Sequence, residues 1–278
     1  MHKGSKVNSA KDHYGFDIKI ISNLNDIEKD NSFHYVFQVD SQRIHFLYRP
    51  AKNSHGLLVA FHGARLNSDG SFVPLPLFRA FDYPEKIKNI SILSFSDPLL
   101  DAYDAKALKL AWYLDSSKYK TSHHIDAITD RIMKLEATDS VLFFGSSGGG
   151  FPAIRHAGIF GMKTLISNSQ LILKEYGYYA EFESILSKNH DNIIEAPDIR
   201  EKITKCSYPS RVILYINELD KQHLTQHVEP FRCYLKECSL ENILDYRPFR
   251  QNAPEGKTPH HVQWDRNLED IIKEIFRI

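Results

Sequence analysis

The sequence of 278 residues lacks several features that would indicate particular classes of protein. It has only 3 cysteines, an odd number without metal-ligand spacing, so we expect reduced thiols in a cytoplasmic protein. Its 35 basic and 35 acidic residues cancel, which leaves no broad basic field for nucleic acid or an anionic membrane. No run approaches the ~20 apolar residues of a membrane span, and the polar first ten residues lack the apolar stretch of a signal peptide. These absences favour a cytoplasmic protein, for which peripheral association with a membrane-bound complex would leave no trace in the sequence.

What the chain does contain is a Gly-x-Ser-x-Gly pattern directly after an apolar strand. Residues 141–144 are apolar, and Gly145, Ser147 and Gly149 occupy the fixed positions of the pattern. A helix-compatible segment, residues 151–157, follows. This arrangement predicts a nucleophile elbow, a strand-to-helix turn that holds the serine in a strained conformation and exposes its hydroxyl at the end of the strand. The alternative is a glycine-rich turn that cradles a phosphate.

Strands and helices alternate along the rest of the chain. We expect strands at residues 33–40, 42–48, 56–61, 90–95, 141–144, 163–167, 211–216 and 242–246. We expect helices at residues 101–115, 125–135, 151–157 and 268–276. Continuous apolar runs such as residues 56–61 are typical of strands buried on both faces. The pattern therefore predicts an α/β fold with a mostly parallel central sheet and helices on both faces.

One domain is expected to span residues 1–278. Residues 1–15 are polar and predict a loose N-terminal arm. Residues 168–208 interrupt the alternation and predict a small cap insertion. Aromatic residues of this insertion, Tyr178 among them, either line a pocket or pack the cap onto the domain, and packing is the commoner use.

A serine nucleophile needs a histidine as general base and a carboxylate that orients the histidine. The acid is expected after a strand that follows the elbow, where the chain offers Asp220 and Glu218. We favour Asp220, because it lies farther along a loop that can fold back over the sheet edge. The alternative use of Asp220 is to cap the helix that begins near Gln222.

The histidine is expected after the last strand and before the terminal helix. His260 and His261 are the two histidines there, and we favour His261 because it adjoins the helical segment. His223 and His227 are four residues apart on a predicted helix, a spacing that suits a metal, but no nearby carboxylate or cysteine is expected to complete such a site. We therefore predict no metal site.

Backbone N–H groups must stabilise the oxyanion of the intermediate. The expected donors are Gly148, directly after the nucleophile, and Ala64 in the His-Gly loop after residues 56–61, with Gly63 as the alternative to Ala64. Arg65 either attracts an anionic substrate or pairs with a surface carboxylate. Asp97 and Tyr178 are the further candidate substrate-binding residues.

These motifs, in this order, resemble an α/β-hydrolase-fold serine enzyme over about residues 40–278. More narrowly, the chain resembles the small O-acetyltransferases encoded with bacterial capsule synthesis, of the type that acetylates the meningococcal serogroup A polymer. The resemblance lies in residues 144–150, in residues 220–224 and in His261 before the final helix. Two departures are Gly148, where that family is expected to have a lysine, and Pro259-His260 in place of a glycine-rich approach to the histidine.

The resemblance implies Ser147, Asp220 and His261 as a catalytic triad, acetyl-CoA as donor substrate, a carbohydrate hydroxyl as acceptor and no bound cofactor. Acyl transfer would then proceed through an acyl-serine. The alternatives are a carboxylesterase or deacetylase with the same residues, and a non-catalytic binding module on the same fold.

Overall fold

The computed structural model describes residues 10–66, 70–103, 108–203, 207–253, 255–261 and 266–278. Within these residues the strands are β1 Ile18–Ile21, β2 Phe33–Val39, β3 Gln42–Arg49, β4 Leu57–Phe61, β5 Ser91–Phe95, β6 Val141–Ser146, β7 Lys163–Ser167, β8 Arg211–Asn217 and β9 Leu244–Phe249. The α-helices are α1 Tyr83–Lys86, α2 Pro98–Ala102, α3 Thr121–Glu136, α4 Gly150–Phe160, α5 Tyr179–Lys188, α6 Lys221–His223, α7 Glu229–Glu237 and α8 Arg266–Phe276. Short 3₁₀ turns include η2 Ser147–Gly149 and η7 Pro259–His261, and a π-helical turn, η5 Leu224–Val228, joins α6 to α7.

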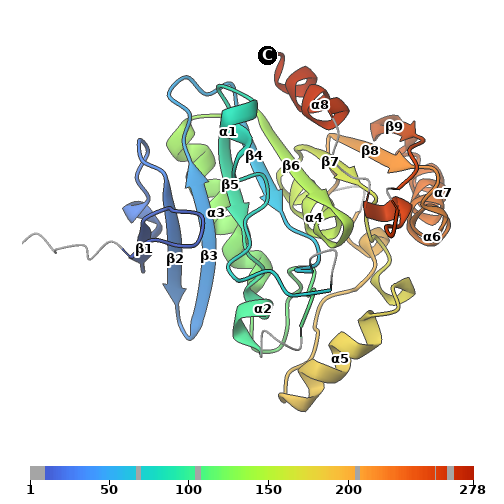
Figure 1. The fold of residues 1–278 in the computed structure, drawn as a ribbon, viewed down its shortest axis with the longest axis horizontal. Coiled ribbons are helices and arrows are strands. Elements are labelled where there is room, and N and C mark those ends of the chain that lie inside the picture. Colours follow the sequence, from blue (N-terminus) through green and yellow to red (C-terminus); the bar gives the residue numbers. More distant parts are fainter. Residues whose placement is uncertain (1–9, 67–69, 104–107, 204–206, 254, 262–265) are drawn as a thin grey trace, which may run out of the picture.

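All described strands belong to one sheet, in the order β1-β2-β3-β5-β4-β6-β7-β8-β9 (Figure 1). The six strands from β5 to β9 in this order are parallel, and β3 is antiparallel to both β2 and β5. Parallel strands direct their carboxyl ends to a single edge of the sheet, so the loops after β4, β6, β7 and β8 meet there. Sequence patterning predicted this mostly parallel sheet, and the prediction is confirmed.

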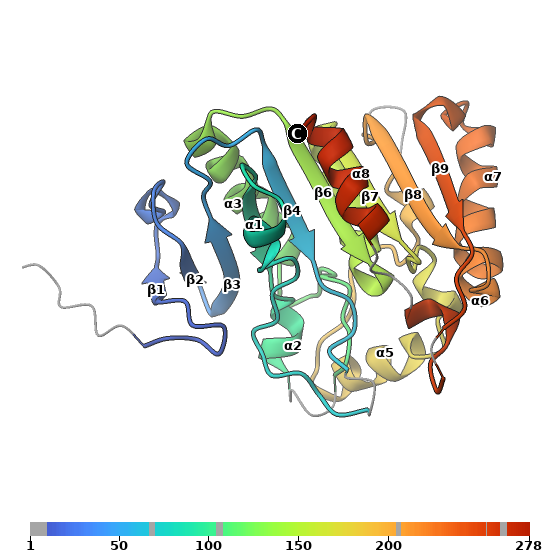
Figure 2. The ribbon, with the colours of Figure 1, turned by 45° about the horizontal axis from the view of Figure 1, so that its top comes forward.

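Both faces of the sheet are covered, as the continuous apolar runs predicted. Successive residues of β4 point to opposite faces: Val59 and Phe61 join the core beneath α3, α4 and α7, whereas Leu58 and Ala60 join the core beneath α1 and α8. Figure 2 shows α8 lying across the central strands. Each fully buried large side chain of this kind stabilises the fold by roughly 1.5–3 kcal/mol. No helix among the described residues combines the length and apolar character needed to cross a bilayer.

The insertion between β7 and β8 carries α5, which lies beyond the carboxyl ends of the central strands in both ribbon views (Figures 1 and 2). Its aromatic side chains surround Trp112. Ring centroids of Tyr176, Tyr178, Tyr179 and Phe182 lie 5.4–6.2 Å from the Trp112 ring. These contacts show that the aromatic residues pack the insertion onto the rest of the chain.

The predicted helix over residues 101–115 is wrong. The helix α2 ends at Ala102, residues 104–107 lie outside the described residues, and residues 108–116 form no helix. Trp112 and Tyr113 have φ values of 52° and 56°, which a right-handed helix excludes. The apolar side chains at Leu108, Leu110 and Leu114 are fully buried, but in an irregular segment.

The N-terminal region also differs from the prediction. Residues 1–9 lie outside the described residues, but the rest of the expected arm is held in place. Lys11 forms an antiparallel β-bridge with Asp17. Asp12 Oδ2 lies 3.2 Å from Nδ1 of His34, a buried histidine on β2. The edge strand β1, absent from the sequence analysis, then pairs with β2.

Candidate active site

The nucleophile elbow predicted from the sequence is present between β6 and α4. Ser147 follows the last residue of β6 with φ = 54°, a left-handed conformation that costs a non-glycine residue roughly 1–2 kcal/mol. The glycines around it are required by space. A Cβ atom on Gly145 would lie 1.9 Å from the carbonyl oxygen of Gly149, and one on Gly149 would lie 2.5 Å from the carbonyl oxygen of Phe61. The turn therefore projects the Ser147 side chain at the carboxyl edge of the sheet.

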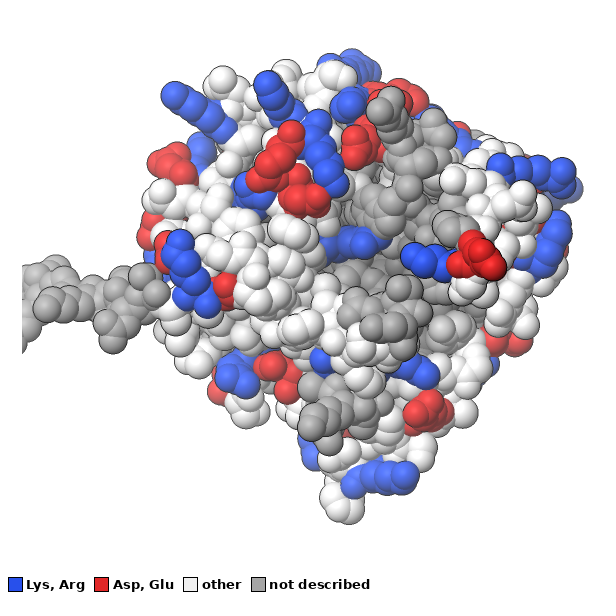
Figure 3. Space-filling model, viewed as in Figure 1, with Lys and Arg blue, Asp and Glu red and all other residues white. Residues whose placement is uncertain are grey.

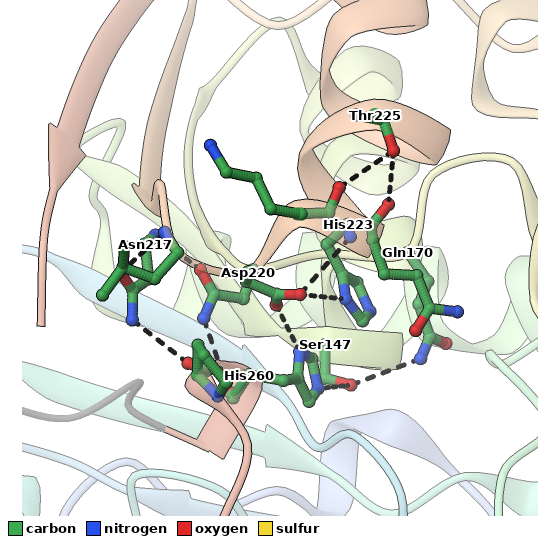
Figure 4. Close-up of polar contacts among 12 residues, drawn as sticks. Ser147, Gln170, Asn217, Asp220, His223, Thr225 and His260 are labelled. Carbon is green, nitrogen blue, oxygen red and sulfur yellow. Dashed lines mark hydrogen bonds and ion pairs between the residues drawn. The ribbon is translucent and has the colours of Figure 1, made fainter. Parts of the chain in front are cut away.

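A histidine reaches Ser147 from the 3₁₀ turn η7, 113 residues later in the chain. His260 Nε2 lies 3.0 Å from Ser147 Oγ, and His260 Nδ1 lies 3.0 Å from Asp220 Oδ2 (Figure 4). A carboxylate only accepts hydrogen bonds, so Nδ1 carries the proton and donates it to Asp220. Nε2 is then the acceptor for the Ser147 hydroxyl, which is the tautomer that a general base requires.

The choice of His261 over His260 is therefore corrected. The turn η7 presents residue 260 to Ser147 and Asp220, so the position of the base is occupied by His260. The two histidines are adjacent, and the sequence held no signal for the direction in which this turn faces.

Asp220 lies three residues beyond the end of β8 and uses both carboxylate oxygens. Oδ2 accepts from His260, while Oδ1 accepts from the backbone N–H of His223 at 3.4 Å and from His223 Nδ1 at 3.1 Å. The two uses weighed from the sequence, helix capping and histidine binding, are thus combined in one carboxylate. Burial alone would raise the pKa of Asp220, but the hydrogen bonds from His223 and His260 outweigh it and hold the pKa well below its usual value. Asp220 is therefore ionised at neutral pH.

Glu218, the alternative acid, faces another partner. Its Oε2 atom forms an ion pair of 2.8 Å with Arg250 Nε, and its backbone N–H donates to Phe249 O. Of the two candidates, Asp220 is the one that contacts the histidine.

Two asparagines hold the histidine loop against the sheet, and the sequence analysis missed both. Asn217 Nδ2 donates to the carbonyl oxygens of Gln251 and Pro259, at 2.8 and 3.2 Å. Asn168 Nδ2 donates to the carbonyl oxygen of His260 at 3.4 Å, and its Oδ1 accepts from the Asn217 N–H. Each asparagine lies at the carboxyl end of a predicted strand, β7 or β8. That position was the available signal for a role at the site.

The loop after β4, expected to supply an oxyanion donor, is fixed by a buried network. His62 Nδ1 donates to Gly63 O at 2.6 Å, and Nε2 accepts from the Asp97 N–H at 3.1 Å. Burial lowers the pKa of His62 to about 4, so the ring is neutral. The Tyr113 hydroxyl accepts from the His62 N–H and donates to Phe95 O. This network places residues 62–64 beside the elbow.

Asp97 belongs to the same network, and its prediction as a substrate-binding residue is corrected. Its side chain is fully buried, and its carboxylate accepts from the N–H groups of Leu99 at 3.1 Å and Tyr113 at 2.8 Å. Burial raises the pKa of Asp97 to about 7. The residue caps α2 and supports the loop through these two hydrogen bonds.

Gly63 lies against the nucleophile. A Cβ atom on Gly63 would lie 3.2 Å from Ser147 Cβ, 3.1 Å from Ser146 O and 3.6 Å from Gly148 N. The loop therefore brings Gly63 and Ala64 close to the Gly148 N–H, the other expected oxyanion donor. The assignment of Ala64 and Gly148 as donors stays a prediction, with Gly63 as the alternative to Ala64.

We expect Gly63→Ala to slow acyl-enzyme formation on the order of 10-fold, because its methyl group would displace this loop by a few tenths of an ångström. The measurement is the labelling rate of the serine by a fluorophosphonate. Gly70→Ala is the matched control, since a Cβ atom at Gly70 meets no neighbour within 4 Å, although its φ of 82° adds backbone strain. An unchanged labelling rate in Gly63→Ala would contradict the placement of this loop at the reacting centre.

A cavity of about 320 Å³ opens beside this loop. Its wall includes Gly63 and Ala64, together with the guanidinium-bearing Arg79 and the aromatic Tyr83. Arg79 Nη2 lies 3.5 Å from Ser146 Oγ, and burial lowers the pKa of Arg79 to about 10, which leaves it cationic at neutral pH. On the surrounding face, acidic and basic side chains are intermixed (Figure 3). The cavity lies beside Gly63, which itself lies against Ser147.

Two other candidate substrate residues have structural partners. Arg65 donates from Nε and Nη2 to Val73 O at 3.1 and 2.9 Å and stacks on the ring of Phe72. The Tyr178 hydroxyl accepts from the Lys109 N–H at 3.1 Å, and the Lys109 ammonium lies 4.3 Å from the centre of its ring. Both side chains organise the loops over the sheet edge.

A further residue next to the nucleophile, Gln170, was not identified from the sequence. Gln170 Nε2 donates to Ser147 Oγ at 3.4 Å, and its Oε1 accepts from Trp112 Nε1 at 2.7 Å (Figure 4). The amide is therefore fixed in orientation, with its donor towards the serine. It follows β7 by three residues, at the same edge as the other site residues.

Among the described residues, Asp220, His223 and His260 have ligand atoms within 4.8 Å of one another, as a metal site would. Both imidazoles, however, direct Nδ1 to the Asp220 carboxylate. His227, the other member of the predicted histidine pair, accepts from the Ile172 N–H through Nδ1. The hydrogen bonds of these residues are those of a serine–histidine–aspartate site.

No family model and no curated protein sequence matches the chain. Solved structures do. The Glycosylation Associate Protein (Gap123) complex from Streptococcus agalactiae aligns with a TM-score of 0.53 and 13% identity, over 77% of this chain and 41% of that one. An acylaminoacyl peptidase from Pyrococcus horikoshii aligns with a TM-score of 0.53 and 12% identity, over 91% and 42%. The chain has the α/β-hydrolase fold.

A third similar structure is close to this chain in length. The esterase Est2 from Thermogutta terrifontis aligns with a TM-score of 0.51 and 13% identity, over 90% of this chain and 91% of that one. By contrast, this chain spans less than half the length of the Gap123 and peptidase chains. At these identities the similarity establishes the fold, and the chemistry must be argued from the site.

Proposed function

We propose that this protein is a serine acyltransferase that forms an acyl-serine at Ser147. The observation that carries the proposal is the hydrogen-bonded series from Ser147 through His260 to Asp220, with distances of 3.0 Å at each step. A serine hydroxyl is almost fully protonated at neutral pH, and this arrangement supplies the base that removes its proton during attack. Asp220, ionised and buried, stabilises the imidazolium that forms.

In the first half-reaction, Ser147 Oγ attacks the acyl carbonyl while its proton moves to His260 Nε2. The oxyanion of the tetrahedral intermediate is stabilised by the N–H groups of Gly148 and Ala64. The intermediate collapses, the bond to the leaving group breaks, and the proton on His260 passes to the leaving thiolate or alkoxide. The product is an ester on Ser147.

In the second half-reaction, His260 Nε2 removes the proton of an incoming hydroxyl, which attacks the acyl-serine. Collapse of the second intermediate returns the proton to Ser147 Oγ and releases the acylated acceptor. When the acceptor is a sugar hydroxyl the enzyme is a transferase, and when it is water the enzyme is an esterase. The outcome depends on water exclusion and acceptor positioning.

We propose acetyl-CoA as donor and a capsular or other cell-surface polysaccharide as acceptor. This assignment rests on the motif resemblance to the capsule O-acetyltransferases. The fold similarity to the Glycosylation Associate Protein (Gap123) complex agrees with a carbohydrate acceptor. The cavity beside Gly63 and the cationic Arg79 suit a donor that carries phosphate groups.

The test is thiol release from acetyl-CoA by the purified protein, with and without capsule oligosaccharide, combined with detection of acetylated sugar. We expect oligosaccharide to accelerate thiol release and to carry the acetyl group. The Ser147→Ala variant should lose turnover by a factor on the order of 10⁴–10⁶. Thiol release that no sugar affects would instead indicate an esterase. Full turnover by Ser147→Ala would exclude the acyl-serine, and absence of fluorophosphonate labelling at Ser147 would favour a binding module.

A further inference from the structure

The triad aspartate, Asp220, contacts a second histidine, His223. This histidine is not part of the Ser147–His260–Asp220 series. His223, at the end of the short helix α6, directs Nδ1 to Asp220 Oδ1 at 3.1 Å, while His260 directs Nδ1 to Oδ2 at 3.0 Å. The carboxylate is therefore held at both oxygens by imidazole N–H groups (Figure 4). Such a carboxylate cannot rotate away from His260 without breaking the other bond.

The two imidazoles also stack on each other. Their ring centroids are 4.1 Å apart and their planes differ by 15°. The face of His223 thus covers the ring of His260, the ring that must accept the proton from Ser147. Stacking restricts rotation of the base, and a neutral ring beside it does not oppose the positive charge that the base gains.

His223 is neutral in this position. Its side chain is almost fully buried, and burial lowers its pKa more than the neighbouring Asp220 raises it. With the proton on Nδ1, its Nε2 is an acceptor, and Nε2 has no hydrogen-bond partner among the described residues. The fold therefore buries a polar atom at a cost in stability, and the hydrogen bond of this side chain goes to the triad carboxylate.

We propose that His223 is a positioning residue: its hydrogen bond fixes the Asp220 carboxylate, and through the carboxylate the His260 ring, in the geometry that general-base catalysis needs. The inference rests on the proposed function, because it acts through the same triad. It also predicts an electrostatic effect. A hydrogen bond from His223 withdraws part of the Asp220 charge from His260, so removal of that bond should make His260 more basic.

Two variants of one residue separate the hydrogen bond from packing. His223→Asn keeps an N–H donor near the position of Nδ1 but loses the ring, whereas His223→Phe keeps a stacking ring but loses the donor. The measurement is the rate at which a fluorophosphonate labels Ser147, as a function of pH. The reaction requires His260 to be neutral. Among the described residues, the titratable groups that face its ring or the neighbouring His223 ring include Asp220, His223, His227 and Tyr176.

In His223→Phe, we expect the fluorophosphonate to label Ser147 on the order of 10-fold more slowly at pH 7. Functional histidines of other proteins lose activity in this way when a hydrogen-bond partner behind them is removed. The acid limb of the variant's pH profile should move to higher pH, by roughly 0.5–1 unit, because the unshared charge of Asp220 favours the imidazolium. In His223→Asn, the acid limb of the pH profile should lie within about 0.2 pH units of its position in the parent protein. A purely structural role predicts the reverse. The labelling rate would then be preserved in His223→Phe and lost in His223→Asn, and the acid limb of the pH profile would not shift in either variant.

The readout distinguishes failure of this inference from failure of the proposed function. If the parent protein is not labelled at all, the proposed acyl-serine chemistry fails. If it is labelled and both variants match it in rate and pH profile, the inference alone is overturned. Parent-like labelling in His223→Phe but not in His223→Asn overturns the inference as well.

A second measurement covers the case in which His223→Phe does not fold. In ¹⁵N-histidine-labelled parent protein, the downfield imidazole N–H signals in the proton NMR spectrum should include one from Nδ1 of His260 and one from Nδ1 of His223, besides those of other hydrogen-bonded histidines such as His62 and His156. His223→Asn should remove the His223 signal, and His260→Gln the His260 signal. If His260→Gln removes a downfield signal and His223→Asn removes none, His223 does not donate to Asp220 and the inference is overturned.

Discussion

His260→Gln is expected to reduce acyl transfer and fluorophosphonate labelling by a factor on the order of 10⁴–10⁶, whereas His261→Gln should stay within about 3-fold of the parent. The reason is geometric. His260 Nε2 is 3.0 Å from Ser147 Oγ, and His260 Nδ1 is 3.0 Å from Asp220 Oδ2. A glutamine at position 260 can donate or accept a hydrogen bond but cannot take up a proton near neutral pH.

The pair of variants is its own control, because the two positions are adjacent and the substitution is the same. Thermal unfolding of both proteins should be compared with the parent, so that loss of activity is not attributed to loss of the fold. Equal loss of activity in the two variants would mean that the turn η7, rather than one side chain, is needed. Loss in His261→Gln alone would restore the assignment made from the sequence.

Arg155→Met is expected to destabilise the protein by about 3–5 kcal/mol, the usual result of removing one partner from a buried ion pair. Arg155, on the elbow helix α4, pairs through Nη1 with Glu195 of the insertion and donates through Nη2 to Tyr113 O at 3.0 Å. Both charged side chains are buried. The variant would leave Glu195 without its arginine, in a region where burial already disfavours an ionised carboxylate. The remaining cation beside Glu195 would be Lys202, whose Nζ lies 3.2 Å from Glu195 Oε1.

The measurement is thermal or urea-induced unfolding, with an expected fall in Tm of roughly 6–20 °C. The double variant Arg155→Met/Glu195→Gln should recover part of the loss, since it removes the buried charge along with its partner. Arg250→Met is a matched control. Arg250 pairs with Glu218 at the surface, where a single ion pair contributes about 0–1 kcal/mol. A similar Tm for Arg155→Met and the parent would contradict a role for this pair in holding the insertion to α4.

The central strands and the elbow were predictable because local signals there agree with the tertiary structure. The apolar residues 141–144 form a strand buried on both faces, and the glycines that follow are needed at their positions by contacts under 3 Å. The positions of Ser147 and Asp220 follow from one rule of parallel sheets, that residues at the carboxyl ends of strands meet at one edge. Their order along the chain then indicated the kind of site.

The rest depended on contacts that a sequence does not record. Leu110 and Leu114 are four residues apart, as on one face of a helix, but both are buried in an irregular segment, and Leu110 packs against the elbow at Gly148. Tertiary packing overrides helical periodicity there. The choice between His260 and His261 depended on the direction in which one short turn faces, which is fixed by asparagines on two other strands. The edge strand β1 is only partly buried and gave no apolar alternation to detect.

The separation of 113 residues between nucleophile and base has a consequence for synthesis of the chain. At ribosomal speeds of about 5–20 residues per second, the segment with Ser147 emerges roughly 6–23 seconds before the segment with His260. The β6 elbow can form in that interval, but the serine has no imidazole to activate it. A nascent chain of this protein would thus stay inert toward thioesters in its surroundings until the segment with His260 has emerged and folded against the elbow.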